Sequence, residues 1–235
     1  MKKSITERTD FAVVMMVKDE IDVIDEAIVT WRARGARVYV CDNGSTDGTL
    51  ERLNTYKGVY GDELHVESDP ETAYFMEKRI NALKDRALSD GFRWIIPADA
   101  DETWHFGTND FSAYLADLYD GTHGPRWFSV PYVDVSPTGN RRLHTHQKGF
   151  GYLDGNCHIS IGNHIITGAG SVCVAPGAII EHFPVRSRAQ MEKKLINHMS
   201  AFVAAGYEHQ HTRDFYECSS DPVAFFDRKW KEFNF

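Results

Sequence analysis

Short apolar runs and helical stretches alternate along the first hundred residues of the chain. Runs of strand length cover residues 11–17, 38–41, 64–66 and 94–97. Between them, apolar side chains recur every three or four positions, as on one face of a helix: Ile21, Ile24, Ile28 and Trp31, then Leu50 and Leu53, then Ala73, Met76, Ile80, Leu83 and Ala87. Gly35 and Gly91 follow the first and third stretches, where a glycine commonly ends a helix. This alternation predicts an α/β fold with an open, mostly parallel sheet and helices on both faces.

The pattern changes in the second half of the chain. Strand candidates separated by long polar loops lie at residues 126–133, 172–175 and 178–180. We therefore expect an irregular, mixed C-terminal half. No low-complexity linker divides the 235 residues, which predicts a single domain over residues 1–235.

Two helices are expected near the C-terminus. Ser187 and Gln190 have capping-box spacing. The helix that they open has a buried stripe of Met191, Leu195, Met199 and Phe202. Residues 221–235 are predicted to form one more helix, whose aromatic side chains suit packing against the body or a peripheral contact with a membrane.

Composition excludes several classes of protein. The formal charge of -8 argues against broad nucleic-acid binding, which requires many Lys and Arg side chains to neutralise phosphates. The longest apolar run, residues 11–17, is far too short to span a bilayer, and residues 1–4 lead into polar sequence, so neither a signal peptide nor a transmembrane helix is expected. The four cysteines are scattered and form no CxxC pair, which favours a reduced, cytoplasmic setting.

An acidic segment follows the fourth apolar run. Asp99, Asp101 and Glu102 place three carboxylates within four residues, at the strand end where open α/β sheets bind ligands. Their mutual repulsion is costly unless they share a cation, and Mg²⁺ or Mn²⁺ commonly binds one or two carboxylates together with substrate phosphates. The segment predicts a divalent metal and a phosphorylated ligand. The alternative is that these acids cap the following helix or face water.

A second polar cluster, residues 42–49, follows the second apolar run. It consists of turn-forming residues, Asp-Asn-Gly-Ser-Thr-Asp-Gly-Thr. Asp42 is placed to accept a hydrogen bond from a base N–H or a ribose hydroxyl. A plain turn in which Asp47 caps a helix is the alternative.

Together, three segments resemble glycosyltransferase family 2: residues 16–20 (Met-Val-Lys-Asp-Glu), 42–49 and 99–102 (Asp-Ala-Asp-Glu), in matching order and spacing. Residues 181–187 also resemble a C-terminal segment of such enzymes. The resemblance implies the GT-A fold, a nucleotide-diphosphate sugar donor, most commonly a UDP-sugar, and a divalent metal. Residues 1–105 would then be the nucleotide-binding half, and residues 106–235 the acceptor-binding half with the C-terminal helices.

The resemblance also implies roles for residues on the nucleotide side. Asp42 would contact the base, and Val17, Lys18 and Glu20 would line the nucleoside pocket. Arg79 and Asn81, on the helix before the acidic segment, would close over the nucleotide. The alternative is that they are ordinary helix residues.

Around the diphosphate, Asp99 would reach the ribose or the water shell of the metal, and Asp101 would coordinate the metal. His182 would supply a late metal or diphosphate contact. Arg186, with Arg188 nearby, would bind the leaving diphosphate.

The same resemblance implies an inverting transfer to a glycan, a lipid-linked glycan or a protein. Inversion requires a general base, usually a carboxylate. The second half lacks a clear Glu-Asp pair, and Asp154 and Glu181 are the candidates, between which the sequence does not choose. His144 and His146 would share a strand face, yet their spacing is not that of a zinc site.

Three alternative functions stay open at this point. A sugar nucleotidyltransferase normally needs a glycine-rich loop after the first strand, and residues 16–20 contain no glycine. A non-catalytic nucleotide-sugar or glycan-binding module would retain the pocket without turnover. A metal-dependent hydrolase would use a similar set of carboxylates and histidines.

Overall fold

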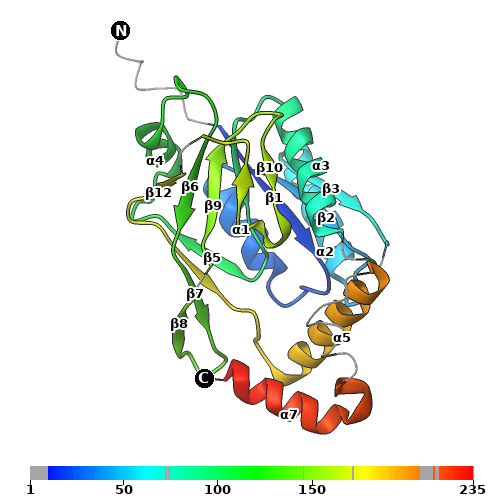
Figure 1. Cartoon of the computed structure of the whole chain (residues 1–235). Helices are drawn as coiled ribbons and strands as arrows, with labels where there is room; N and C mark the ends of the chain where they lie inside the picture. The colour runs from blue at the N-terminus through cyan, green and yellow to red at the C-terminus, as the bar shows by residue number, and fades with distance from the viewer. Residues whose placement is uncertain are drawn as a thin grey trace.

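A seven-stranded sheet forms the centre of the molecule (Figure 1). The computed structural model describes residues 10–71, 73, 75–144, 146–170, 172–206, 214 and 217–234. In order across the sheet, the strands are β12 (Val172–Val174), β6 (Arg126–Val130), β9 (Lys148–Tyr152), β4 (Trp94–Pro97), β1 (Phe11–Val17), β2 (Arg37–Asp42) and β3 (Leu64–Ser68). Within this sheet only β9 runs antiparallel to its neighbours. The predicted mostly parallel α/β sheet is confirmed.

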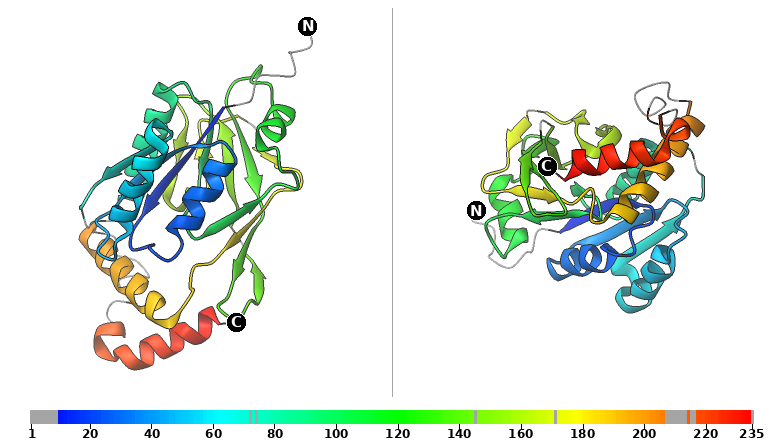
Figure 2. Two further views of the ribbon diagram at one scale, coloured as in Figure 1. Left: turned by 180° about the vertical axis from the view of Figure 1, so that it is seen from behind. Right: turned by 90° about the horizontal axis from the view of Figure 1, so that it is seen from below.

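Helices cover both faces of this sheet (Figure 2). Side chains alternate along β1, so Val13 and Met15 pack in one core while Ala12 and Val14 pack in another. The first core includes α1 (Ile24–Ala33), α2 (Thr49–Tyr60) and α4 (Phe111–Leu118). The second includes α3 (Met76–Ser89) and the small hairpin of β10 (His158–Ile159) and β11 (Ile166–Thr167). The three helices expected in the first hundred residues are therefore present.

A smaller sheet extends from the loop after β4. Its order is β5 (Glu102–His105), β13 (Ile179–His182), β7 (Tyr132–Val135) and β8 (Arg141–Leu143). The segment 126–133, expected as one strand, is divided at Pro131 between β6 of the large sheet and β7 of the small one. In the pairing of β13 with β5, His182 lies opposite Glu102, which brings the C-terminal histidine to the acidic segment.

Strand β9 was not predicted, because its sequence Lys-Gly-Phe-Gly-Tyr carries two glycines. Gly149 is required by a close approach of neighbouring atoms. A Cβ at this position would lie 1.9 Å from Trp127 Nε1 and 2.4 Å from the backbone oxygen of Phe128.

Two helices of the C-terminal part pack in a small core of their own beside the carboxyl ends of the strands (Figure 1). Helix α5 (Arg188–Ala204) begins at Ser187, whose hydroxyl accepts a hydrogen bond from Gln190 N at 3.2 Å, as the capping pattern predicted. Helix α7 (Pro222–Phe233) confirms the helix expected at residues 221–235, of which Phe235 lies outside the described residues. Residues 1–4 lie outside them as well. No described helix has both the length and the apolar character needed to cross a membrane.

Candidate active site

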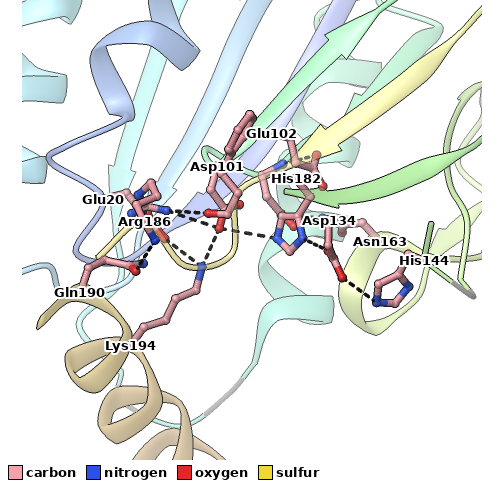
Figure 3. A network of polar contacts seen from close by, with 12 residues as sticks. Glu20, Asp101, Glu102, Asp134, His144, Asn163, His182, Arg186, Gln190 and Lys194 are labelled. Atoms are coloured by element: carbon pink, nitrogen blue, oxygen red, sulfur yellow. Dashed lines mark hydrogen bonds and ion pairs between the residues drawn. The ribbon is translucent and has the colours of Figure 1, made fainter. Parts of the chain in front are cut away.

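Asp101 lies at the centre of an ion-pair network beyond the carboxyl end of β4 (Figure 3). Its side chain is 4% exposed, and three cations approach the same oxygen, Oδ2. Lys194 Nζ lies at 2.6 Å, His182 Nε2 at 3.6 Å and Arg186 Nη1 at 3.7 Å. Burial alone would raise the pKa of Asp101, but Lys194 and His182 outweigh it and hold the pKa well below its usual value. Asp101 is therefore an ionised carboxylate among cations.

The other two acids of this segment share a buried lysine. Lys148 of β9 is 1% exposed and forms ion pairs with both Asp99 and Glu102. Glu102 Oε2 also accepts hydrogen bonds from Asp99 N and Trp104 Nε1, each at 3.0 Å. Asp99 Oδ1 accepts a further bond from Asn163 Nδ2 at 3.1 Å. The repulsion that the sequence predicted among these carboxylates is thus offset by lysine ammonium groups of the chain itself.

His182 connects Asp101 to a carboxylate that the sequence did not single out. Its Nδ1 lies 2.8 Å from Asp134 Oδ1 of β7, and its ring stacks on Tyr132 at a centroid distance of 4.9 Å. Burial would lower the pKa of His182, but Asp101 and Asp134 outweigh it and raise the pKa to about 9. The ring is therefore oriented by Asp134 and presents Nε2 to Asp101.

Asp101 and His182 are side chains of the kinds that commonly ligate a divalent metal ion. A carboxylate oxygen and an imidazole nitrogen face each other, and metal-ligating histidines commonly donate their other N–H to a carboxylate, as His182 does to Asp134. An ion bound there would take the place of the proton on Nε2. Among the described residues no group of three or more His, Cys, Asp and Glu side chains is arranged to hold a metal. Substrate oxygens or waters would have to complete the coordination, as is usual for Mg²⁺.

The loops after β1 and β2 interlock beside this network. Asp19 N donates to Ser45 Oγ at 2.9 Å, and Thr46 N donates to Asp19 Oδ1 at 2.7 Å. Lys18 Nζ donates to the backbone oxygen of Asn43 at 3.0 Å. Val17 is buried in the core, and its backbone oxygen accepts from Asn43 N at 2.8 Å. Val17 and Lys18 therefore hold the loop at residues 42–49 in place.

Glu20 and Arg186 join the first of these loops to the C-terminal segment. Arg186 Nη2 lies 2.6 Å from Glu20 Oε2, and its Nε lies 2.7 Å from Asp22 Oδ2. Burial raises the pKa of Glu20, although Lys194 and Arg186 oppose this shift. Arg188, in contrast, pairs with Glu192 and Asp227 on the outer side of the helices. Of the two arginines, only Arg186 belongs to the network.

Asp42 has an acceptor without a partner. The residue is fully buried, and its Oδ1 accepts a hydrogen bond from Ser45 N at 3.0 Å. Its Oδ2 is buried and has no hydrogen-bond donor among the described residues. An unpaired buried carboxylate oxygen is costly unless a ligand supplies the donor.

Arg79 and Asn81 use their polar groups within the protein. Arg79 is 4% exposed and forms an ion pair with Asp69 at 2.9 Å. Asn81 exchanges hydrogen bonds with the backbone of Ile159, at 2.8 and 3.0 Å. These side chains fix the loop after β3 and strand β10 to α3, and the structure does not bring them to Asp101.

The two carboxylates expected as general base lie away from the network. Asp154 accepts from Asn156 N at 2.9 Å, and the adjacent Leu153 pairs with Arg93, at the amino end of β4 and hence at the opposite end of that strand from Asp99. Glu181 precedes His182 on β13 and so points to the opposite face of the small sheet. It pairs with Arg141 and with His105, at 3.0 Å in the latter case.

Three histidines, His144, His146 and His164, gather beside Asp134. The ring centroid of His144 lies 4.9 Å from that of Tyr132 and 5.1 Å from that of His146, and His164 lies 5.2 Å from His146. His158 is elsewhere and pairs with Glu77. The three imidazole rings are partly exposed and lie next to the network.

Lys148, Lys194 and Asp134 are the charged residues closest to the acidic segment and His182 that the sequence analysis missed. Lys194 carries a weak signal, since it follows Arg186 on the same C-terminal segment. Asp134 carries another, as an acid within the apolar stretch Tyr-Val-Asp-Val. Lys148 has no local signal, because its partners lie 46 and 49 residues away in the sequence.

Comparisons with known proteins agree with this architecture. Residues 12–181 match the profile of the family described as Glycosyl transferase family 2. The crystal structure of S. aureus TarS 1–349 is similar at 15% sequence identity and a TM-score of 0.52, covering 88% of this chain and 74% of that chain. The complex of S. aureus TarS 1–349 with UDP matches at 13% identity and a TM-score of 0.49, with the same coverage.

At these identities the structural likeness concerns the fold, and no curated relative matches the chain's sequence. The family match covers most of the chain and includes the loops that carry Glu20, Asp42 and Asp101. It ends at residue 181, so Arg186 and Lys194 lie beyond it. The GT-A arrangement of the sheet and the match over residues 12–181 lead to one conclusion: the chain belongs to glycosyl transferase family 2.

Proposed function

We propose that this protein transfers a sugar from a nucleoside diphosphate donor to an acceptor hydroxyl, with the diphosphate bound at Asp101. The observation that carries the proposal is the convergence of Lys194, Arg186 and His182 on one buried carboxylate at the carboxyl edge of the sheet. A diphosphate would pair with the cations of this site, and a divalent ion would bind its carboxylate. Family membership favours glycosyl transfer over nucleotidyl transfer and hydrolysis.

The nucleoside would lie over the interlocked loops after β1 and β2. Asp42 Oδ2, which lacks a donor within the described chain, would accept the N–H of the base. A uracil ring offers such a group, so a UDP-sugar is the first donor to test. Glu20 would line the pocket beside Arg186. Asp99, whose side chain is 26% exposed despite its pairing with Lys148, would reach the ribose or a metal-bound water.

The chain's cations would stabilise the leaving group. As the bond from the sugar to the diphosphate breaks, negative charge grows on the phosphate, and Arg186 and Lys194 are placed to bind it. Asp101 and His182 would hold Mg²⁺ or Mn²⁺. When bound, such an ion supplies Lewis-acid stabilisation of the same charge. Asp134 would keep the His182 ring oriented toward it.

We further propose that the reaction inverts the anomeric centre, on the basis of the family. Neither Asp154 nor Glu181 lies beside Asp101, so we place no general base on them. The acceptor would be a glycan, a lipid-linked glycan or a protein hydroxyl, docked on the side of Asp134. NMR of the product anomer, made from an α-linked donor, tests inversion directly: a β-linked product supports it, and an α-linked product excludes it.

Calorimetric binding of UDP, GDP, CDP and dTDP, with and without Mn²⁺, tests the donor site. We expect one diphosphate to bind in a metal-dependent manner, and Asp101→Ala to lose that binding. Asp117→Ala, at an exposed position of α4, is the matched control and should bind normally. If none of the four diphosphates binds the wild type, the proposal is wrong. Binding without turnover on any acceptor would favour a binding module instead.

A further inference from the structure

Lys194 lies where a metal ion on Asp101 would have to bind. Its ammonium is 2.6 Å from Asp101 Oδ2, closer than the other two cations of the network (Figure 3). Mg²⁺ binds carboxylate oxygens at about 2.0–2.1 Å. An ion and an ammonium group cannot both be the nearest neighbour of the same oxygen, so metal binding requires Lys194 to leave it.

Of the three cations around Oδ2, Lys194 is the least restrained. His182 is held by Asp134 and stacks on Tyr132. Arg186 is held by Glu20, by Asp22 and by the backbone oxygen of Phe183. Among the described residues, Lys194 has only one further ion-pair partner, Glu20 Oε1, at 3.7 Å. Its side chain is 37% exposed, against 14% for Arg186 and 16% for His182.

Helix α5 need not move for Lys194 to change partners. Asn197 Nδ2 donates to Asp19 Oδ2 at 2.7 Å, and Lys193 Nζ lies 3.1 Å from Asp19 Oδ1. Gln190 Oε1 accepts from Arg186 N at 3.1 Å. These contacts dock the helix on the loops of the site independently of Asp101. The four-carbon stem of Lys194 can therefore rotate while the helix stays in place.

We propose that Lys194 is a counter-ion that prevents a metal ion from binding Asp101 until a nucleoside diphosphate binds. The ammonium group of Lys194 then leaves Asp101 and forms an ion pair with the diphosphate. A metal ion alone would displace Lys194 and leave an unpaired ammonium close to a dication. A metal with a diphosphate brings the negative charge that Lys194 needs as its new partner. Metal and nucleotide then bind as one unit. This inference rests on the proposed function.

Titration with Mn²⁺, followed by the EPR signal of the free ion, tests the inference without measuring turnover. Wild type, Lys194→Met and Lys231→Met are compared with and without UDP. We expect the wild type to bind Mn²⁺ at least tenfold more tightly when UDP is present. Lys194→Met should bind Mn²⁺ alone at least tenfold more tightly than the wild type does, and should gain less from UDP. Lys231→Met is the matched control, because Lys231 is an exposed residue of α7, and it should behave as the wild type.

The outcomes separate this inference from the proposed function. Equal binding of free Mn²⁺ by the wild type and Lys194→Met overturns the counter-ion role. If UDP binds but Mn²⁺ binds to none of the three proteins, the metal role of Asp101 and this inference both fail while the donor site stands. If UDP fails to bind and calorimetry finds no other diphosphate that binds, the proposed function itself is wrong. Circular dichroism of each variant checks that it is folded. The second substitution, Lys194→Gln, should reproduce the Mn²⁺ binding of Lys194→Met if the effect comes from loss of the ammonium group.

Discussion

Asp134 and His182 form a hydrogen-bonded pair, 2.8 Å between Oδ1 and Nδ1, that points the other ring nitrogen at Asp101. Removing the carboxylate frees the ring to rotate and lowers its basicity. We expect Asp134→Ala to weaken Mn²⁺ binding in the presence of nucleotide by roughly 10- to 100-fold, the usual cost of losing such an outer partner. EPR titration measures this directly. Glu181→Gln, one residue before His182 but on the opposite face of β13, should leave Mn²⁺ affinity unchanged, and an equal loss in both variants would argue against the orienting role.

Lys148 is the cation on which Asp99 and Glu102 depend. Lys148→Met leaves two carboxylates, one of them with a fully buried side chain, without their cation. Such a loss costs about 3–5 kcal/mol in the free energy of unfolding. Urea denaturation measures it. The double variant Lys148→Met/Glu102→Gln should recover part of the loss, and the exposed Lys231→Met should stay within about 0.5 kcal/mol of the wild type. A stable Lys148→Met would show that the ion pairs contribute little.

Asp42 should discriminate between nucleotides. We expect Asp42→Asn to weaken binding of the preferred diphosphate by roughly 10- to 100-fold, equivalent to about 1–3 kcal/mol for a lost charged hydrogen bond. The same change should not destabilise the free protein, because Oδ2 has no donor within the described residues. Calorimetry and urea denaturation on one preparation give both quantities. Unchanged affinity for every nucleotide would show that Asp42 does not contact the base.

Acid should weaken the contact between α5 and the loop after β1. Burial alone would raise the pKa of Asp19, but hydrogen bonds from Thr46 and Asn197 and the charge of Lys193 outweigh it and lower the pKa. A carboxylate with a lowered folded-state pKa stabilises the protein above its unfolded pKa of about 3.9, and this stabilisation is lost as the pH falls through the folded value.

Urea unfolding from pH 6 to pH 2.5 tests this dependence on Asp19→Asn, which keeps a residue that tolerates the positive φ of 56° at this position. We expect the wild type to be more stable than the variant at pH 6 and the difference to shrink with acid. Parallel curves would show that Asp19 does not contribute.

The alternation of apolar runs and helical stretches was enough to predict β1 to β4, the first three helices and the position of the acidic segment, because each depends on neighbours within a few residues. Capping signals likewise placed α5. Strand β7 was anticipated only in part, as the end of the segment 126–133. Strand β9 escaped prediction because it pairs with β4 and β6, which are distant in sequence, and because its glycines are required by the approach of Trp127.

The same distinction holds at the site. Sequence alone determined that carboxylates follow β4 and that polar residues cluster in the loops after β1 and β2, where we propose that the nucleoside binds. Only the tertiary structure decided how those carboxylates are neutralised. Lys148, Lys194 and His182 come from a strand, a helix and a second sheet, and burial of the acids makes their pairing strong. Coulombic attraction depends on distance in space, and no spacing along the chain encodes it.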